Sequence, residues 1–432
     1  MSIARRTFLA GSLASGLSLN ASGKQPNSWR WKLLTPHRTQ QGNGVPVARD
    51  PWNGLLAHDE SLYLFGGAFP KYGSPAGPGD LKTLGVLNDL WRFDLRRGAD
   101  SESASPNQKP SSGENCWKLL EADNGRAVFE PSAKRPCGRV LPCWIVAHDR
   151  FYLFGGLTAY ARGWKTRLLN DLWCYDPASR EWTLLEADDG RMLDRPTQVS
   201  GGRPTALAAM GTCLVGDKIY CFAGWGGKQP SVVLSSELWS FDVNTRRWEH
   251  LGNGDTGQLW PPKRYCPALT AWGGKLYLWG GRDTQDRRPQ FYNDLWEYDP
   301  EQAGWKQLSA NQPGGVSQQS TLPIARYAMG HAQVDGHWYI FGGFGSERGN
   351  SPQLNDLWRL DLRDKTWTLV EPHDGSKDFT SSARRPCVRR VPAMTGTDNS
   401  VYMFGGLDLT SGPDENGPLI GFNDLWQGST SI

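Results

Sequence analysis

The sequence has no excess of one charge and no long apolar segment. Its 432 residues contain 47 Lys and Arg against 44 Asp and Glu, which gives a formal net charge of +3. This balance argues against a protein that binds nucleic acid mainly by electrostatic attraction. Beyond the N-terminal segment, no stretch is long and apolar enough to cross a bilayer. Wholesale disorder is also excluded, because 38% of the residues are hydrophobic and only 21% are charged.

Motifs that carry catalysis or metal binding are missing as well. The sequence contains no G-x-S-x-G, no H-E-x-x-H and no phosphate-binding loop. Its eight Cys form no C-x-x-C pair, so neither a metal site nor a cofactor is predicted. Cys213 and Cys221 flank a turn at Gly216 and Asp217 and could form a cross-strand disulfide. The alternative for these two residues is a pair of buried free thiols.

The N-terminal segment reads MSIARRTFLAGSLASGLSLNASG. Arg5 and Arg6 precede Phe8, Leu9 and a short, mildly apolar stretch, an order that resembles a twin-arginine export signal. Residues 1–22 are therefore predicted to be an export signal peptide, and the mature protein is expected to be periplasmic or secreted. Removal of this segment would lower the formal net charge to about +1.

Gly, Pro and Trp are abundant, at 51, 29 and 21 residues, which is typical of many short strands joined by turns. One phrase occurs six times, as LNDLWRFD (87–94), LNDLWCYD (169–176), LSSELWSFD (234–242), YNDLWEYD (292–299), LNDLWRLD (354–361) and FNDLWQ (422–427). Each copy follows an aromatic strand that ends in small residues, such as LYLFGG (62–67). Each copy but the last precedes an outer strand such as EWTLL (181–185). The repeating unit is therefore predicted to be four short strands.

Gly-Gly after an aromatic strand, followed by a Trp strand, resembles the Kelch repeat. The resemblance covers residues 28–427 and implies an all-β, six-bladed β-propeller in residues 28–432. The blades are expected at about 46–120, 135–185, 203–251, 264–308, 326–370 and 385–427. The sixth unit stops after Trp426 without an outer strand, and residues 28–34 (SWRWKLL) are predicted to supply it and close the ring.

An Arg recurs at one position of the repeat. It stands seventeen residues before the second Gly in four units, as Arg139, Arg264, Arg326 and Arg389, and Arg49 is offset by one residue. The third unit has Leu207 there. The resemblance implies that this position opens the innermost strand, so that a ring of Arg faces a central pocket and binds a carboxylate, sulfate or phosphate. The alternative is that these residues bond neighbouring backbone carbonyls as ordinary Kelch architecture.

The loops between the second and third strands, and those between blades, are long and lie on the face of the Arg position. Trp164, in AYARGWKTR (159–167), and Trp225 are candidate aromatic contacts for an anionic ligand. The alternative for both is a packed or solvated loop side chain.

Two functions fit these features. The first is an exported binding module for an anionic glycan or an acidic protein segment, acting as a monomer without nucleic acid or a membrane span. The second is a mutarotase or epimerase that acts on an anionic sugar such as sialic acid. An enzyme would need a desolvated carboxylate with a perturbed pKa beside the Arg groups, and the sequence identifies no catalytic residue. A copper oxidase is disfavoured, because the Tyr and His residues it needs cannot be assembled at the channel mouth.

Overall fold

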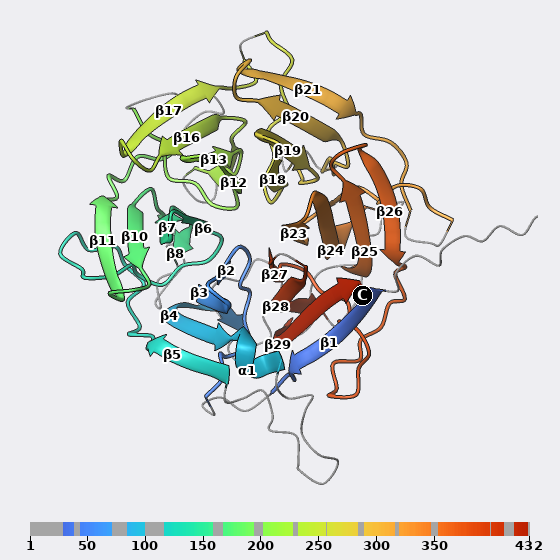
Figure 1. Ribbon diagram of the computed structural model, residues 1–432. Helices are drawn as coiled ribbons and strands as arrows, with labels where there is room; N and C mark the ends of the chain where they lie inside the picture. Colours follow the sequence, from blue (N-terminus) through green and yellow to red (C-terminus); the bar gives the residue numbers. More distant parts are fainter. Residues whose placement is uncertain are drawn as a thin grey trace, which may run out of the picture.

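Six antiparallel sheets, each with four main strands, stand around a central axis as the blades of a propeller (Figure 1). The computed structural model describes residues 29–38, 44–70, 84–99, 116–158, 167–193, 202–227, 232–255, 257–283, 289–315, 319–346, 353–397, 399–409 and 419–430. Each blade is formed by one repeat, and the chain visits the blades in order around the ring. The predicted six-bladed, all-β fold is confirmed.

The strands of each blade are given from the axis outward. Blade one has β2 (Leu55–His58), β3 (Ser61–Pro70), β4 (Leu84–Asp94) and β5 (Trp117–Glu121). Blade two has β6 (Cys143–Ala147), β7 (Arg150–Phe154), β10 (Leu172–Asp176) and β11 (Glu181–Glu186). Blade three has β12 (Gly211–Val215), β13 (Lys218–Phe222), β16 (Leu238–Asp242) and β17 (Arg247–Gly252).

The remaining blades follow the same order. Blade four has β18 (Ala268–Trp272), β19 (Lys275–Trp279), β20 (Leu295–Asp299) and β21 (Gly304–Ser309). Blade five has β23 (Gly330–Val334), β24 (His337–Gly345), β25 (Gln353–Asp361) and β26 (Thr366–Glu371). Blade six has β27 (Ala393–Gly396), β28 (Val401–Leu409), β29 (Leu419–Thr430) and β1 (Trp29–Thr35). Short additional elements are β8 (Leu157–Thr158), β9 (Arg167–Leu168), β14 (Trp225–Gly226), β15 (Val233–Leu234), β22 (Arg326–Tyr327) and α1 (Leu95–Ala99).

The ring is closed by the N-terminal strand, as expected. Strand β1 pairs antiparallel with β29, which places Trp29 opposite Thr430 and Trp31 opposite Gly428. The indole Nε1 of Trp31 donates a 2.7 Å hydrogen bond to the carboxylate of Glu371 in blade five. The pairing covers what would otherwise be the exposed edge of the last blade.

Both faces of each blade are apolar, and this is why the sheets stack radially. On β4, Trp91 and Phe93 pack in a cluster that contains Phe404 of blade six. Leu90, on the opposite face, packs in a cluster that contains Trp144 of blade two. Each large side chain buried in this way contributes roughly 1.5–3 kcal/mol to folding. Among the described residues, no helix is long and apolar enough to cross a membrane.

Polar side chains of the recurring phrase also join the blades. The amide of Asn88 in NDLW donates to the carbonyl of Pro136, at the entry to the next blade, at 3.0 Å. At the end of β5, Glu121 accepts a 3.0 Å hydrogen bond from the indole of Trp182 in blade two. The same Glu–Trp contact joins Glu186 of blade two to Trp248 of blade three at 3.1 Å. The outer-strand ends therefore hold neighbouring blades together.

The cysteines are free thiols, and the cross-strand disulfide considered from the sequence is wrong. The β12–β13 register pairs Cys213 with Tyr220 and Cys221 with Thr212, so the two Cys lie on opposite faces of the sheet. The sulfur of Cys221 lies instead 3.9 Å from that of Cys143 in blade two.

Candidate functional site

The five Arg of the recurring position are buried inside their blades. Their side chains are fully inaccessible to solvent. Each guanidinium binds both oxygens of the Asp in the NDLW phrase of its own blade, at 2.6–2.8 Å. The pairs are Arg49–Asp89, Arg139–Asp171, Arg264–Asp294, Arg326–Asp356 and Arg389–Asp424. The expectation that these side chains face a central pocket therefore disagrees with the structure.

The remaining donors of these guanidinium groups are also used inside the blade. In each case Nη1 donates to the carbonyl of the first Gly of the Gly-Gly pair, at 2.8–3.1 Å. Burial alone would lower the pKa of Arg139, but pairing with Asp171 raises it above its usual value. Burial favours the neutral form of Asp424, yet Arg389 outweighs this effect and lowers the pKa of the carboxyl. The pairs are thus charged structural bridges, the architectural alternative of the sequence analysis.

The backbone at this position joins consecutive blades. The second Gly of each blade donates its N–H to the carbonyl of the next Arg, as Gly67 does to Arg139 at 2.9 Å. Blade two makes the same bond to Leu207, also at 2.9 Å, so this bond does not depend on the Arg side chain. Gly67 has a φ of 103°, and a Cβ there would lie 2.5 Å from the carbonyl of Asp50. This crowding explains the invariant second Gly of the six units.

The axis is filled by side chains just before the inner strands begin. An axial cluster forms there from Trp52, Leu141, Ala209, Cys266, Ala328 and Val391, one residue from each blade. The indole of Trp52 donates to the carbonyl of Met329 in blade five, at 3.3 Å. Beyond the cluster, the inner strands of all six blades line a cavity of about 270 Å³. The axial cluster therefore separates this cavity from the face that carries the long loops.

On the loop face, the residues next to the buried Arg surround the axis. In chain order they are Asp50, Val140, Ala208, Tyr265, Tyr327 and Arg390. Each is bridged by backbone hydrogen bonds to the residue after a Gly pair, in the same order Ala68, Leu157, Trp225, Arg282, Phe344 and Leu407. We call these twelve residues the channel mouth. They occupy the place that the sequence analysis assigned to the five buried Arg. Five of them are partly exposed and the other seven are buried; the partly exposed residues are Asp50, Trp225, Tyr265, Arg282 and Arg390.

Two Arg of the channel mouth stand over aromatic rings. The guanidinium of Arg390 lies 5.1 Å from the ring centre of Phe344. That of Arg282 lies 5.2 Å from the ring centre of Tyr327 and donates to its hydroxyl at 3.3 Å. Tyr327 and Phe344 stack with ring centres 5.6 Å apart, and Tyr265 lies 5.4 Å from Tyr327. Blade five thus provides an aromatic floor between two cations from blades four and six.

One carboxyl of the channel mouth has a strongly perturbed pKa. Burial raises the pKa of Asp50 to about 6, although the N–H of Trp52 and the charge of Arg390 act in the opposite direction. The backbone N–H of Trp52 donates to this carboxyl at 3.1 Å. Asp50 therefore changes its charge within the physiological range, beside an Arg.

Comparison with known protein sequences identifies the same kind of repeated unit. The description "KLHDC2/KLHL20/DRC7 Kelch-repeats domain" matches residues 122–315, and "Kelch motif" matches residues 325–373. The protein is a Kelch-repeat propeller. Kelch domain-containing protein 10 of Homo sapiens is 23% identical over 345 residues, which cover 79% of this chain and 65% of that protein. Kelch domain-containing protein 3 of Bos taurus is 24% identical over 293 residues, 65% of each chain.

A third relative is longer than this Kelch propeller. The leucine-zipper-like transcriptional regulator 1 homolog of Drosophila melanogaster is 24% identical over 358 residues, which are 82% of this chain but 29% of that protein. The chain thus spans 65% or less of the length of these relatives. The similarity concerns the Kelch repeats.

Only one of the two predicted aromatic contacts, Trp225 and Trp164, lies within the described residues. Trp225 lies half-buried in β14 at the channel mouth and packs against the axial cluster. Trp164 lies outside the described residues, so the prediction for it stays open. Sequence reasoning missed Arg390 and Asp50 as channel-mouth residues. The signal available for both was adjacency, since Asp50 follows Arg49 and Arg390 follows Arg389.

Proposed function

We propose that this Kelch propeller binds an acidic segment of a partner protein at the channel mouth. Arg282 and Arg390, which lie over the rings of Tyr327 and Phe344, would bind its carboxylates. Kelch propellers generally mediate protein interactions, and the relatives share the repeats with this chain. The single observation that carries the proposal is the pair of cations on either side of an aromatic floor.

The residue types agree with those that dominate binding energies at protein interfaces. Arg and aromatic residues are enriched among such hot spots, and Lys and acidic residues are depleted. The Nε of Arg390 is buried and has no hydrogen-bond partner among the described residues. Asp408, which follows the channel mouth on β28, is only 3% exposed and accepts from Gln353 at 2.8 Å. It therefore contributes little negative charge to the surface a ligand would meet.

The test is a double replacement of the two half-buried cations of the channel mouth. Arg282→Ala with Arg390→Ala is expected to weaken binding of acidic peptides, presented as an array, by at least about 30-fold, because paired charges at an interface are lost. The control is Arg247→Ala with Lys306→Ala, which removes the same charge from the exposed outer strands β17 and β21. Equal weakening by both double variants, or no binding of any acidic peptide, contradicts the proposal. Binding of sulfated or acidic glycans instead of peptides would assign the site to glycans.

A second function is favoured by Asp50. The sequence analysis required a desolvated carboxyl beside an Arg for a sugar mutarotase or epimerase, and Asp50 has a pKa of about 6 near Arg390. In this reading Asp50 exchanges a proton with the anionic sugar that the two Arg bind.

Asp50→Asn separates the two functions. If the protein is an isomerase, the variant loses at least about 100-fold in the rate of sialic acid mutarotation, followed by NMR, while ligand binding persists. Absence of catalysed mutarotation in the wild-type protein rules this function out. We retain export to the periplasm or the outside as part of the proposal, since residues 1–22 lie outside the described residues.

A further inference from the structure

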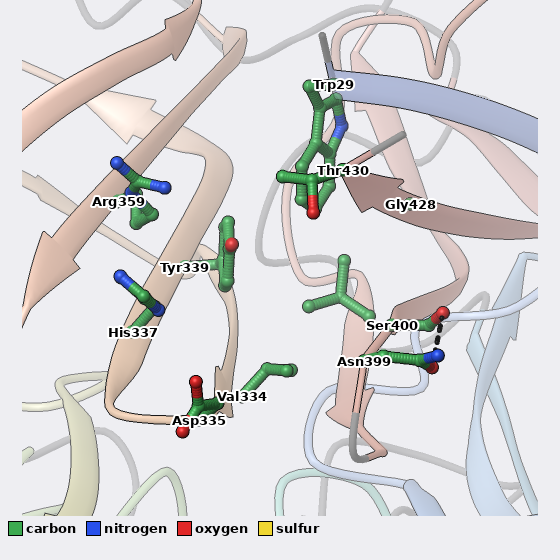
Figure 2. A pocket seen from close by; sticks show the side chains of 11 residues that line it. Trp29, Val334, Asp335, His337, Tyr339, Arg359, Asn399, Ser400, Gly428 and Thr430 are labelled. Carbon is green, nitrogen blue, oxygen red and sulfur yellow. Dashed lines mark hydrogen bonds between the residues drawn. The ribbon is translucent and has the colours of Figure 1, made fainter. Parts of the chain in front are cut away.

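A groove of about 460 Å³ opens where blade five meets blade six, at the closure of the ring. Figure 2 shows Arg359, His337 and Tyr339 of blade five on one wall and Trp29 and Thr430 of blade six on the other. The hairpins that join the first and second strands of both blades form its base. Those hairpins lie at the opposite ends of the strands from the Gly pairs. The groove is therefore separate from the channel mouth.

The equivalent Arg of another blade can be compared directly with Arg359. Arg92 of blade one occupies the same position, opposite Tyr63 as Arg359 is opposite Tyr339. The Nε of Arg92 donates to the hydroxyl of Ser61 at 2.8 Å. Blade five has His337 in place of that Ser, and the buried Nε of Arg359 has no hydrogen-bond partner among the described residues.

The charge of Arg359 is likewise not balanced by an ion pair within the described part of the chain. Two acids of blade five, Asp335 and Asp361, contact other groups. Asp335 lies 3.2 Å from Arg363, and Asp361 lies 3.4 Å from His337 and 3.7 Å from Arg363. Burial, assisted by Arg359, lowers the pKa of His337, which favours the neutral imidazole. Among the described residues, Arg359 is thus a cation without an ion-pair partner; it lies in the wall of the groove beside the hydroxyl of Tyr339.

The wall formed by blade six is present because the third and fourth strands of that blade, β29 and β1, are not joined by a turn of the chain. In blade two a tight turn at residues 177–180 joins the third and fourth strands, and their pairing stops at Asp176 and Glu181. In blade six the equivalent strands belong to opposite ends of the chain, and their pairing continues to Trp29 and Thr430. The ring of Trp29 lies 4.9 Å from that of Tyr339 at an interplanar angle of 33°. The closure therefore adds an indole to this groove.

We propose that this groove binds a sugar that carries one carboxylate, such as a hexuronate. The carboxylate pairs with Arg359, for which a planar fork is the suited donor. Trp29 and Tyr339 offer apolar ring surface to the sugar, and the hydroxyl of Thr430 offers a hydrogen bond to one of its hydroxyl groups. The volume lies within the range of about 300–1,000 Å³ for small-molecule sites. This site is independent of the function proposed for the channel mouth.

The test measures the dissociation constant of glucuronate and galacturonate by ligand-observed NMR titration of the folded protein. Wild type should bind at least one of these uronates, and neutral glucose and galactose at least about tenfold more weakly. Arg359→Gln should weaken uronate binding at least about tenfold, and Arg359→Lys, which retains the charge without the fork, by less. The variant Arg282→Ala with Arg390→Ala should bind uronates as wild type does.

The matched control is Arg92→Gln, which removes the same side chain from the same position of blade one. It should leave uronate affinity unchanged. The proposal is overturned if no uronate binds, if the neutral sugars bind equally well, or if Arg359→Gln and Arg92→Gln have the same effect. An unfolding transition recorded for each variant separates loss of the site from loss of the fold.

Discussion

Replacing Arg326 with Ala is expected to reduce the free energy of unfolding by about 3–5 kcal/mol. The variant leaves the carboxylate of Asp356 buried and fully inaccessible, with the indole of Trp358 as its remaining side-chain donor at 2.9 Å. A buried charge that loses its partner keeps the full cost of its lost hydration. The bond from Arg326 to the carbonyl of Gly342 is lost as well. The measurement is equilibrium unfolding in urea, followed by Trp fluorescence.

Two further variants make this result specific. Lys306→Ala, on the exposed side of β21, should change the free energy of unfolding by no more than about 0.5 kcal/mol. Arg326→Met combined with Asp356→Leu should recover much of the loss, because it removes the unpaired charge together with its partner. A loss below about 1 kcal/mol for Arg326→Ala would contradict the structural role. If the variant folds, its channel mouth should still bind ligand, since Arg326 contacts no solvent.

The fold could be predicted from the sequence because every blade repeats the same signals. Five Gly pairs, one Ala-Gly pair and six Trp phrases fix the number of blades, and the missing outer strand after Trp426 identifies Trp31 as part of the closing strand. These inferences depend only on the order and number of the strands. The direction of a side chain is harder to predict, because a strand pattern gives the position of a residue in the blade but not the group to which its side chain bonds.

The buried Arg show where the prediction failed and which signal would have corrected it. Arg and the Asp of NDLW are present together in five units, and both are absent from the third, which has Leu207 and Glu237. Residues that are present and absent together within one repeat array are partners, so the pattern indicated an internal ion pair. The channel-mouth residues could not be ranked in this way, because Asp50, Arg282 and Arg390 follow no repeat. Of the two alternatives for Cys213 and Cys221, free thiols are observed, because the two residues differ by one residue in register and lie on opposite faces of the sheet.

Blade three lacks the Arg of the other blades and can therefore be compared with the variant Arg326→Ala. Leu207 replaces the Arg, and the carboxyl of Glu237 is 1% exposed. Its Oε2 accepts a 2.9 Å hydrogen bond from Trp239, as the Asp does in the other blades, but its Oε1 has no partner among the described residues. Burial raises the pKa of Glu237, and the bond from Trp239 only partly opposes this effect. Blade three therefore has no Arg at this position but retains a buried carboxyl group, whose raised pKa favours the protonated, neutral form.

A pH dependence of stability follows from this arrangement. The folded protein holds the proton of Glu237 more tightly than the unfolded chain does, so the stabilisation is complete below the pKa of an unfolded Glu. It is lost as the pH rises through the higher pKa of the folded state. Glu237→Gln, which resembles the protonated acid and cannot ionise, should match wild type at pH 4 and exceed it in stability at pH 8. Subtracting the two unfolding free energies at each pH cancels the other carboxyl groups.

Building the Arg–Asp pair into blade three should also raise the free energy of unfolding at pH 8, and by more than Glu237→Gln does. Leu207→Arg combined with Glu237→Asp rebuilds the ion pair of the other five blades, and we expect it to raise the free energy of unfolding at pH 8 by about 1–3 kcal/mol, since a buried unsatisfied group is removed. Leu207→Arg alone should gain less, because the longer Glu side chain does not reproduce the two-oxygen geometry of Asp. The same urea titration measures both variants. A stability difference between wild type and Glu237→Gln that does not change from pH 4 to pH 8 would mean that the pKa of Glu237 is the same in the folded and unfolded states, and would contradict the raised pKa.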